Sequence, residues 1–151
     1  MKVRHIFISE DHNYFGHHNQ PPGTSEVKEV DAATLVEGKG IEGDRFFDYK
    51  ENYKGQATFF EIETFHELRE RFGVFDRGVE AFRRNIIVEG VDLNSLIGKE
   101  FEVQGIRFEG VEEARPCYWM EQAFCEGAEK ALAGKGGLRV RILSSGVLKV
   151  E

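Results

Sequence analysis

The clearest strand pattern in the chain lies in residues 85–112, which have the sequence NIIVEGVDLNSLIGKEFEVQGIRFEGVE. Short runs rich in β-branched and aromatic residues alternate there with glycines, at Gly90, Gly98 and Gly105. Runs of this kind, bounded by turn residues, are typical of β-strands. We therefore predict three strands in this stretch, over Ile86–Val88, Glu100–Gln104 and Arg107–Glu112.

Two helical patterns and several further strand patterns surround this stretch. One helix is predicted over residues 59–72, because Thr58 and Glu61 have the spacing of a capping box and Gly73 follows as a typical C-terminal residue. A second helix is predicted over Tyr118–Ala133, where apolar residues recur at helical spacing. The further predicted strands are Val3–Ser9, the interrupted pattern Val27–Val36, Leu138–Leu143 and Val147–Val150.

Many short strands with two helices inserted among them indicate an α+β fold that is predominantly β. The architecture that we expect is a closed or partly closed barrel. The strands do not alternate regularly with helices, so a Rossmann-like sheet is not expected. A chain of 151 residues, 40% hydrophobic and 31% charged, fits a single domain over residues 1–151.

The composition also limits the classes of partner. The formal net charge is −7, and the basic residues are scattered among more numerous acids, whereas nucleic-acid binding needs a clustered basic surface. The N-terminal apolar run contains charges, and no later segment approaches the length of a membrane span. We therefore expect a cytoplasmic protein with reduced cysteines that binds neither nucleic acid nor membranes.

Cys117, within Arg115-Pro116-Cys117-Tyr118-Trp119, is the strongest candidate for chemistry. Proline is favoured in the first turn of a helix, so the thiol is predicted to lie among the free amide donors of the second helix. Those donors and the Arg115 guanidinium favour a thiolate, the form that attacks electrophiles and binds metals. The alternative is a buried, inert cysteine at the strand–helix junction. Cys125 lies two turns further along the predicted helix, too far for a disulfide, and is expected to be a packing residue.

Other familiar motifs are not found. There is no Walker-type phosphate loop and no nucleophile elbow. His12, His17 and His18 form a histidine cluster, but a metal site there would need a further ligand such as Asp11 or Glu10, and a polar loop is the preferred interpretation. Four arginines beside glycine-rich or turn-like segments are candidates for an anion site, with solvated surface charge as the alternative: Arg45, Arg84, Arg115 and Arg139.

Five segments in a particular order are not explained by these patterns. They are Gly40-Ile41-Glu42-Gly43-Asp44-Arg45, Arg84-Asn85-Ile86-Ile87-Val88-Glu89-Gly90-Val91-Asp92-Leu93, Leu96-Ile97-Gly98, Pro116-Cys117 and Gly136-Gly137. Together they resemble the MOSC domain, which is the C-terminal domain of molybdenum cofactor sulfurases. The domain is also found in small stand-alone bacterial proteins and in amidoxime-reducing enzymes. The resemblance runs from about Val3 to the end of the chain.

The resemblance implies a largely β-barrel domain in which Cys117 carries the chemistry. In this family the matching cysteine looks like the protein ligand to the metal of a molybdenum cofactor, or like a carrier of sulfur as a persulfide. A soft thiolate suits both roles. Because the cofactor ends in a phosphate, Arg45, Arg84 and Arg115 become candidates for anion contacts. The other expected cofactor-binding residues are Gly43, Asp44 and Asn85.

The expected function is therefore cofactor binding and, if the protein is an enzyme, reduction of N-hydroxylated small molecules with electrons from a partner protein. A sulfur-donor protein is the expected partner if Cys117 carries sulfur instead. The alternatives are a non-catalytic sulfur-relay or binding module and a scaffold with an inert structural cysteine. The chain has no room for the pyridoxal-phosphate domain of the sulfurases, so pyridoxal phosphate is not expected to bind. Phe46-Phe47 stand where relatives often have a histidine, which leaves the substrate class open.

Overall fold

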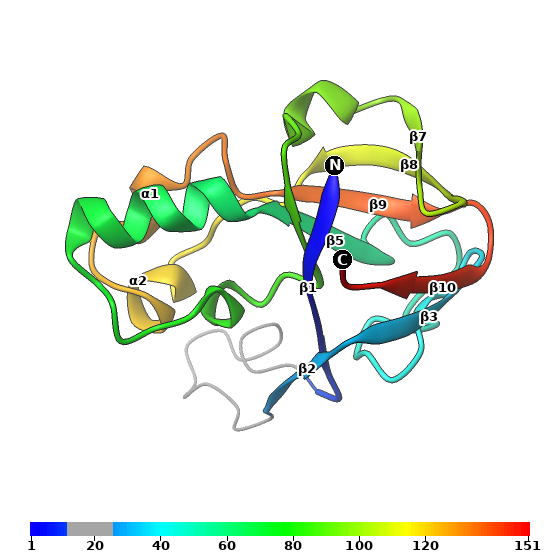
Figure 1. Ribbon diagram of the computed structural model, residues 1–151, viewed down its shortest axis with the longest axis horizontal. Helices are drawn as coiled ribbons and strands as arrows, with labels where there is room; N and C mark the ends of the chain where they lie inside the picture. The colour runs from blue at the N-terminus through cyan, green and yellow to red at the C-terminus, as the bar shows by residue number, and fades with distance from the viewer. Residues whose placement is uncertain (12–25) are drawn as a thin grey trace.

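The computed structural model describes residues 1–11 and 26–151, and Figure 1 shows the order of the elements. The strands are β1 (Lys2–Ser9), β2 (Val27–Val30), β3 (Ala32–Val36), β4 (Gly40–Ile41), β5 (Ala57–Glu61), β6 (Ile86–Glu89), β7 (Glu100–Val103), β8 (Ile106–Glu113), β9 (Leu138–Ile142) and β10 (Gly146–Lys149). The α-helices are α1 (Ile62–Phe72), α2 (Trp119–Ala123) and α3 (Ala128–Ala131). Two short 3-10 helices are η1 (Val79–Phe82) and η2 (Leu93–Leu96).

The strands form two sheets that share one core. The larger sheet has seven strands in the order β2-β1-β6-β5-β9-β8-β7, and the smaller has three in the order β10-β3-β4. Only Asp31 separates β2 from β3, so the chain passes directly from one sheet to the other. The predicted α+β class with predominantly β content is confirmed. Within the described residues the strands form these two sheets and not one closed ring.

The central strands of the larger sheet are covered on both faces. Neighbouring side chains of a strand point to opposite faces, so Phe59 packs in the core shared by the two sheets, and Phe60 packs in a second core with the helices. On β6, Ile86 likewise packs in the core shared by the two sheets, and Ile87 packs in the second core. Figure 1 shows α1 and α2 together at one side of the strands. Continuous apolar runs in this sequence therefore mark strands that are buried on both faces.

The first predicted helix begins later than expected. Residues Ala57–Glu61 form β5, and α1 begins at Ile62 and ends before Gly73, which has the predicted left-handed conformation. The capping-box prediction for Thr58 is wrong, because its hydroxyl donates to Asn85 Oδ1 at 3.2 Å. Through α1, β5 connects to β6 as a parallel pair, so the fold contains a βαβ unit that the sequence interpretation missed.

The second predicted helix, Tyr118–Ala133, is in fact divided into α2 and α3. Gly127 precedes α3 with a φ of 92°. The Glu121 carboxylate accepts backbone hydrogen bonds from Glu129 and Gly127, at 2.9 Å each, and these bonds lower its pKa. Apolar residues of both helices pack in the second core, which explains why the sequence shows one continuous helical pattern.

The remaining predicted strands are confirmed to within one or two residues, except that Val27–Val36 is divided into β2 and β3. The segment after β3, predicted to be irregular, is mostly turn and contains the two-residue strand β4. In the part of the chain that the structure describes, no helix is both long enough and apolar enough to cross a membrane.

Candidate functional site

Cys117 lies in the loop that leaves β8 and enters α2, and its side chain is exposed. Its backbone carbonyl accepts a hydrogen bond from the Met120 N–H at 2.9 Å, which starts the turn into the helix. Cys117 therefore precedes α2, whereas the sequence predicted the first helical turn. Because α2 has only 5 residues, its helix dipole is weak and is not a strong source of positive potential at the thiol.

Arg84 joins the loop that carries Cys117 to the turn before β9. Its Nη2 donates to the Ala114 carbonyl at 2.9 Å, and its Nε donates to the Gly136 carbonyl at 2.8 Å. Its Nη1 donates to the Phe82 carbonyl at 3.0 Å. Since a guanidinium presents its donors in a rigid planar fork, these bonds fix Ala114 relative to Gly136. The loop is thus anchored just upstream of the thiol.

Gly136 and Gly137 allow the two segments to approach this closely. A β-carbon on Gly136 would overlap the Ala114 carbonyl oxygen, and one on Gly137 would overlap the Phe59 carbonyl oxygen. Gly137 also has a φ of 107°, which residues with a side chain rarely adopt. Its carbonyl accepts a hydrogen bond from the Ala114 N–H at 2.9 Å. The glycine pair is therefore a packing requirement of the loop that carries Cys117.

The environment of Arg84 combines burial with several charges. Its pKa is lowered to about 10, mainly by burial and in addition by the charges of the Arg139 and Arg45 guanidiniums. Cys117 and Glu113 act in the opposite direction, because a negative charge at either position favours the cation. A group with a pKa of about 10 is still charged at neutral pH. Arg84 therefore places a fixed positive charge near the Cys117 sulfur.

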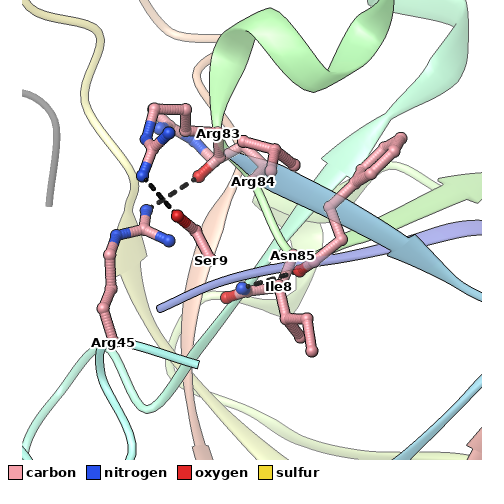
Figure 2. Close-up of a pocket in the computed structure, with 8 residues that line it drawn as sticks. Ile8, Ser9, Arg45, Arg83, Arg84 and Asn85 are labelled. Carbon is pink, nitrogen blue, oxygen red and sulfur yellow. Dashed lines mark hydrogen bonds between the residues drawn. The ribbon is translucent and has the colours of Figure 1, made fainter. Parts of the chain in front are cut away.

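Arg84 also lines a narrow cleft, shown in Figure 2. Arg83 Nη2 donates to Ser9 Oγ at 2.9 Å, and Arg45 Nη2 donates to the Arg83 carbonyl at 3.3 Å. The guanidiniums of Arg45 and Arg83 approach each other near Ser9 in Figure 2. The described residues that line the cleft are Phe7, Ile8, Ser9, Val27, Arg45, Arg83, Arg84 and Asn85.

Asp44 orients Arg45 and the turn around it. Its buried carboxylate accepts backbone hydrogen bonds from Ser9 at 3.0 Å and from Phe46 at 3.2 Å. The same carboxylate pairs with Arg45 Nη1 at 3.3 Å. Burial lowers the pKa of Arg45, and the charge of Asp44 partly opposes that effect. Gly43, with a φ of 85°, forms the turn before this pair.

Asn85 joins three strands directly beside Arg84. Its Oδ1 accepts from the Thr58 backbone N–H at 3.1 Å, and its Nδ2 donates to the Phe7 carbonyl at 3.1 Å. The side chain therefore links β5 to β1 at the start of β6. Asn85 lines the cleft, and its amide is already bonded within the fold.

A second group of charges lies at the surface near Arg84. Lys54 Nζ is 2.7 Å from Glu112 Oε1, and Arg139 Nη1 is 3.9 Å from the same oxygen. The Lys54 hydrogen bond is the main cause that lowers the Glu112 pKa, and Arg139 and Arg115 contribute. We call Lys54, Arg115 and Arg139 the outer cations, and Arg45, Arg83 and Arg84 the inner arginines.

Sequence reasoning missed some of these residues. Arg83 was not selected, although an adjacent pair of arginines before a buried strand was an available signal. Arg83 has a φ of 54°, which turns the chain at the end of η1. The guanidiniums of the two arginines therefore have different partners: that of Arg83 donates a hydrogen bond to Ser9 Oγ, and that of Arg84 donates one to the Ala114 carbonyl. Nothing in the sequence links Lys54 with Glu112, because only the pairing of distant segments brings them together.

The described residues contain two thiols and no obvious metal cluster. Among residues 1–11 and 26–151, no group of three or more histidine, cysteine, aspartate or glutamate side chains is arranged to hold a metal ion. His12, His17 and His18 lie outside the described residues. Cys125 is free and half-buried against the second core, as predicted for a packing residue, and burial raises its pKa. Cys117 is exposed, in contrast to the alternative of a buried cysteine.

Solved structures with the same fold include the YuaD protein from Bacillus subtilis, with a TM-score of 0.72 at 19% identity over 99% of this chain and 91% of that chain. YiiM from Geobacillus stearothermophilus matches with a TM-score of 0.68 at 17% identity, over 98% of this chain and 70% of that one. YiiM from Escherichia coli matches with a TM-score of 0.63 at 16% identity, over 97% of this chain and 66% of that chain. No protein with a curated description matches the sequence.

A family model described as the MOSC domain matches residues 49–151. The match includes Arg84, Asn85, Arg115 and Cys117, and it begins after the Gly43-Asp44-Arg45 turn. It covers well over half of the chain, and it confirms the family that the sequence resembles. The chain therefore belongs to the MOSC domain family.

Proposed function

We propose that this domain binds a molybdenum cofactor with Cys117 as the protein ligand to the metal. The observation that carries the proposal is the exposed Cys117 thiol, which is close enough to the fixed guanidinium of Arg84 for their charges to interact. A thiolate is a soft ligand that suits molybdenum.

The donor set around Cys117 fits such a group. A metal held by protein side chains alone needs three or four ligands, and the described residues offer no such cluster. A cofactor that brings its own metal ligands needs only one protein donor, which the single exposed thiol can supply. The chemistry of the site is therefore consistent with a metal carried by an organic cofactor.

The inner arginines suit the phosphate of the cofactor. A guanidinium has five N–H donors, of which Arg84 uses three in hydrogen bonds to carbonyls. Arg45 uses two, one to Asp44 and one to the Arg83 carbonyl. The other N–H groups of both side chains have no partner among the described residues, so they are available for charge-assisted hydrogen bonds to a phosphate.

When bound, the cofactor supplies a metal centre for reduction of N-hydroxylated small molecules, with electrons delivered by a separate protein. The residues of the chain bind and orient the cofactor. Cys117 holds the metal, Arg45 and Arg84 hold the phosphate, and Asp44 fixes the direction of Arg45. By anchoring Ala114, Arg84 also keeps the Cys117 loop in one position.

Sulfur transfer is the second candidate, and the exposure of Cys117 favours it. In this reaction the Cys117 thiolate attacks the outer sulfur of a persulfide on a donor protein. A new S–S bond forms, the S–S bond of the donor breaks, and the donor thiolate leaves. Such a step needs an accessible thiol group and no deep pocket, and the Cys117 side chain is exposed.

Metal analysis tests the first proposal directly. The protein is purified from a host that makes the cofactor, beside Cys117→Ser and the control Cys125→Ser. We expect molybdenum in the unmodified protein and in Cys125→Ser, and none in Cys117→Ser. Equal or absent molybdenum in all three proteins would overturn the metal-ligand role.

Intact mass analysis of the same samples tests sulfur transfer. The persulfide predicts an added mass of one sulfur atom that is removed by a reductant, is present in Cys125→Ser and is lost in Cys117→Ser. Absence of this adduct, including after incubation with a persulfide donor, would contradict the carrier role.

A further inference from the structure

We propose that the Cys117 site selects negatively charged substrates, and that the outer cations Lys54, Arg115 and Arg139 provide this selection. The inference rests on the proposed function, because it takes Cys117 as the reacting centre. It adds a substrate class, namely small molecules that carry a carboxylate or a similar anionic group.

The charges around Cys117 are unbalanced. Lys54 and Arg139 share the single carboxylate of Glu112, at 2.7 Å and 3.9 Å. Glu113 is the other nearby acid, and its carboxylate accepts a hydrogen bond from the Gly136 N–H at 3.1 Å. Four cations, the three outer ones and Arg84, therefore face two carboxylates. A local positive excess in a chain with a net charge of −7 is a specific feature of this surface.

Two of the outer cations, Arg115 and Arg139, are able to bind a ligand. The Arg139 side chain is 33% exposed, and its distance of 3.9 Å to Glu112 is longer than a hydrogen bond. Within residues 1–11 and 26–151, Arg115 has neither a hydrogen bond nor an ion pair, and it lies two residues from Cys117. Guanidiniums with free N–H groups form paired, charge-assisted bonds with carboxylates.

The geometry connects the outer cations to the thiol. Arg139 lies on β9, opposite Glu112 on β8, and it is close enough to Arg84 for their charges to interact. Arg84 in turn interacts with Cys117. An anion held between Arg115 and Arg139 would therefore lie at the rim of the cysteine site, with its uncharged part directed to the sulfur.

A matched pair of alkylating reagents tests this idea, because iodoacetate and iodoacetamide differ mainly in charge. The protein is made in a host that lacks the molybdenum cofactor, so that Cys117 is not occupied by metal. The alkylation rates at Cys117 and Cys125 are followed separately by mass spectrometry, with N-acetylcysteine as a reference thiol. The measured quantity is the iodoacetate rate divided by the iodoacetamide rate.

We expect this ratio at Cys117 to exceed the reference ratio severalfold at low salt and to fall toward it at high salt. Arg139→Gln and Arg115→Gln are each expected to lower the ratio about two- to threefold, the size expected for one partly screened charge. Arg107→Gln is the control, since Arg107 is exposed on β8 and lies five residues, about 17 Å, from Glu112. Its ratio should not change.

The inference is overturned if the ratio at Cys117 does not exceed that of N-acetylcysteine, or if Arg139→Gln and Arg115→Gln both match the unmodified protein. Either result is distinct from failure of the proposed function, because molybdenum content is measured separately. A protein that binds molybdenum through Cys117 without charge selection would refute only the substrate class.

Discussion

The inner arginines and the outer cations have the same kind of charge but are held in different ways. Arg84 is bonded to three backbone carbonyls at 2.8–3.0 Å, and burial lowers its pKa to about 10. Arg139 is one-third exposed, with one carboxylate oxygen 3.9 Å away. Arg84 therefore belongs to the framework of the site, whereas Arg139 is able to reorient toward a ligand.

This difference separates two functions that positive charge can have beside a reactive thiol. A guanidinium bonded to carbonyls on several sides provides a constant potential and fixes the backbone, but it has few donors left. A guanidinium at the surface contributes little to stability and keeps its donors for a ligand. The two groups should therefore respond differently to substitution, in stability and in selectivity.

The largest effect on stability is expected at Gly137, which packs close to Arg84, one of the inner arginines. In Gly137→Ala, the β-carbon would overlap the Phe59 carbonyl oxygen, and the φ of 107° would be strained. We expect a loss of roughly 4 kcal/mol in the free energy of unfolding, or failure to fold. Urea denaturation followed by circular dichroism measures the change.

Gly134→Ala is the matched control for this substitution. Gly134 also has a positive φ, 79°, but a β-carbon there meets no atom within 4 Å. Only the backbone strain is then added, at a cost of about 1 kcal/mol. Equal losses for the two variants would show that the close packing beside Arg84 does not constrain the loop.

Arg84→Gln should have the next largest effect. It removes the bonds to the Ala114, Gly136 and Phe82 carbonyls, and a shorter neutral amide cannot replace them all. We expect a loss of about 3 kcal/mol in the free energy of unfolding, against less than about 0.5 kcal/mol for Arg139→Gln. Urea denaturation of both variants gives the comparison, and similar losses would remove the distinction between framework and surface cations.

Much of the fold was predictable, because the strand pattern depends on local sequence. Residues 85–112 gave β6, β7 and β8 nearly at their observed bounds, with glycines at the turns. Thr58-Phe59-Phe60-Glu61 was assigned to a helix, because neighbouring aromatic residues that pack on opposite faces of a strand also fit a helical pattern. The other strands and α1 determine that this segment is buried on both faces, and the local sequence alone does not show this.

The site was predictable in part, for a different reason. Motifs along the chain identified Cys117, Arg45, Arg84 and Asn85, and the last three line one cleft. They could not indicate that Arg84 bonds carbonyls on three segments, since that depends on the backbone path around Gly136. The pairing of Lys54 with Glu112 depends likewise on tertiary structure, so this part of the charge pattern became visible only in the fold.

The smallest stability effect is expected for Glu112→Gln. In the folded protein the Lys54 hydrogen bond, together with Arg139 and Arg115, holds the Glu112 pKa below its usual value. The charged carboxylate therefore stabilises the fold at pH values above its unfolded pKa of about 4.3, and this contribution is lost as the pH falls through the lower folded pKa. The group is 42% exposed, so we expect a loss of only about 0.3 kcal/mol at pH 7, which disappears in acid.

The same substitution should have a clearer effect on selectivity, because it removes a negative charge from among the outer cations. We expect the iodoacetate-to-iodoacetamide ratio at Cys117 to rise about two- to threefold in Glu112→Gln. Glu109→Gln is the matched control, since Glu109 pairs with Arg141 at 2.7 Å and is 40% exposed, but lies further along β8 from the thiol. We expect the two variants to lose similar stability and only Glu112→Gln to have a raised alkylation ratio, which would place the substrate-selecting charge at the outer cations. An unchanged ratio in both variants would assign the selection to Arg84.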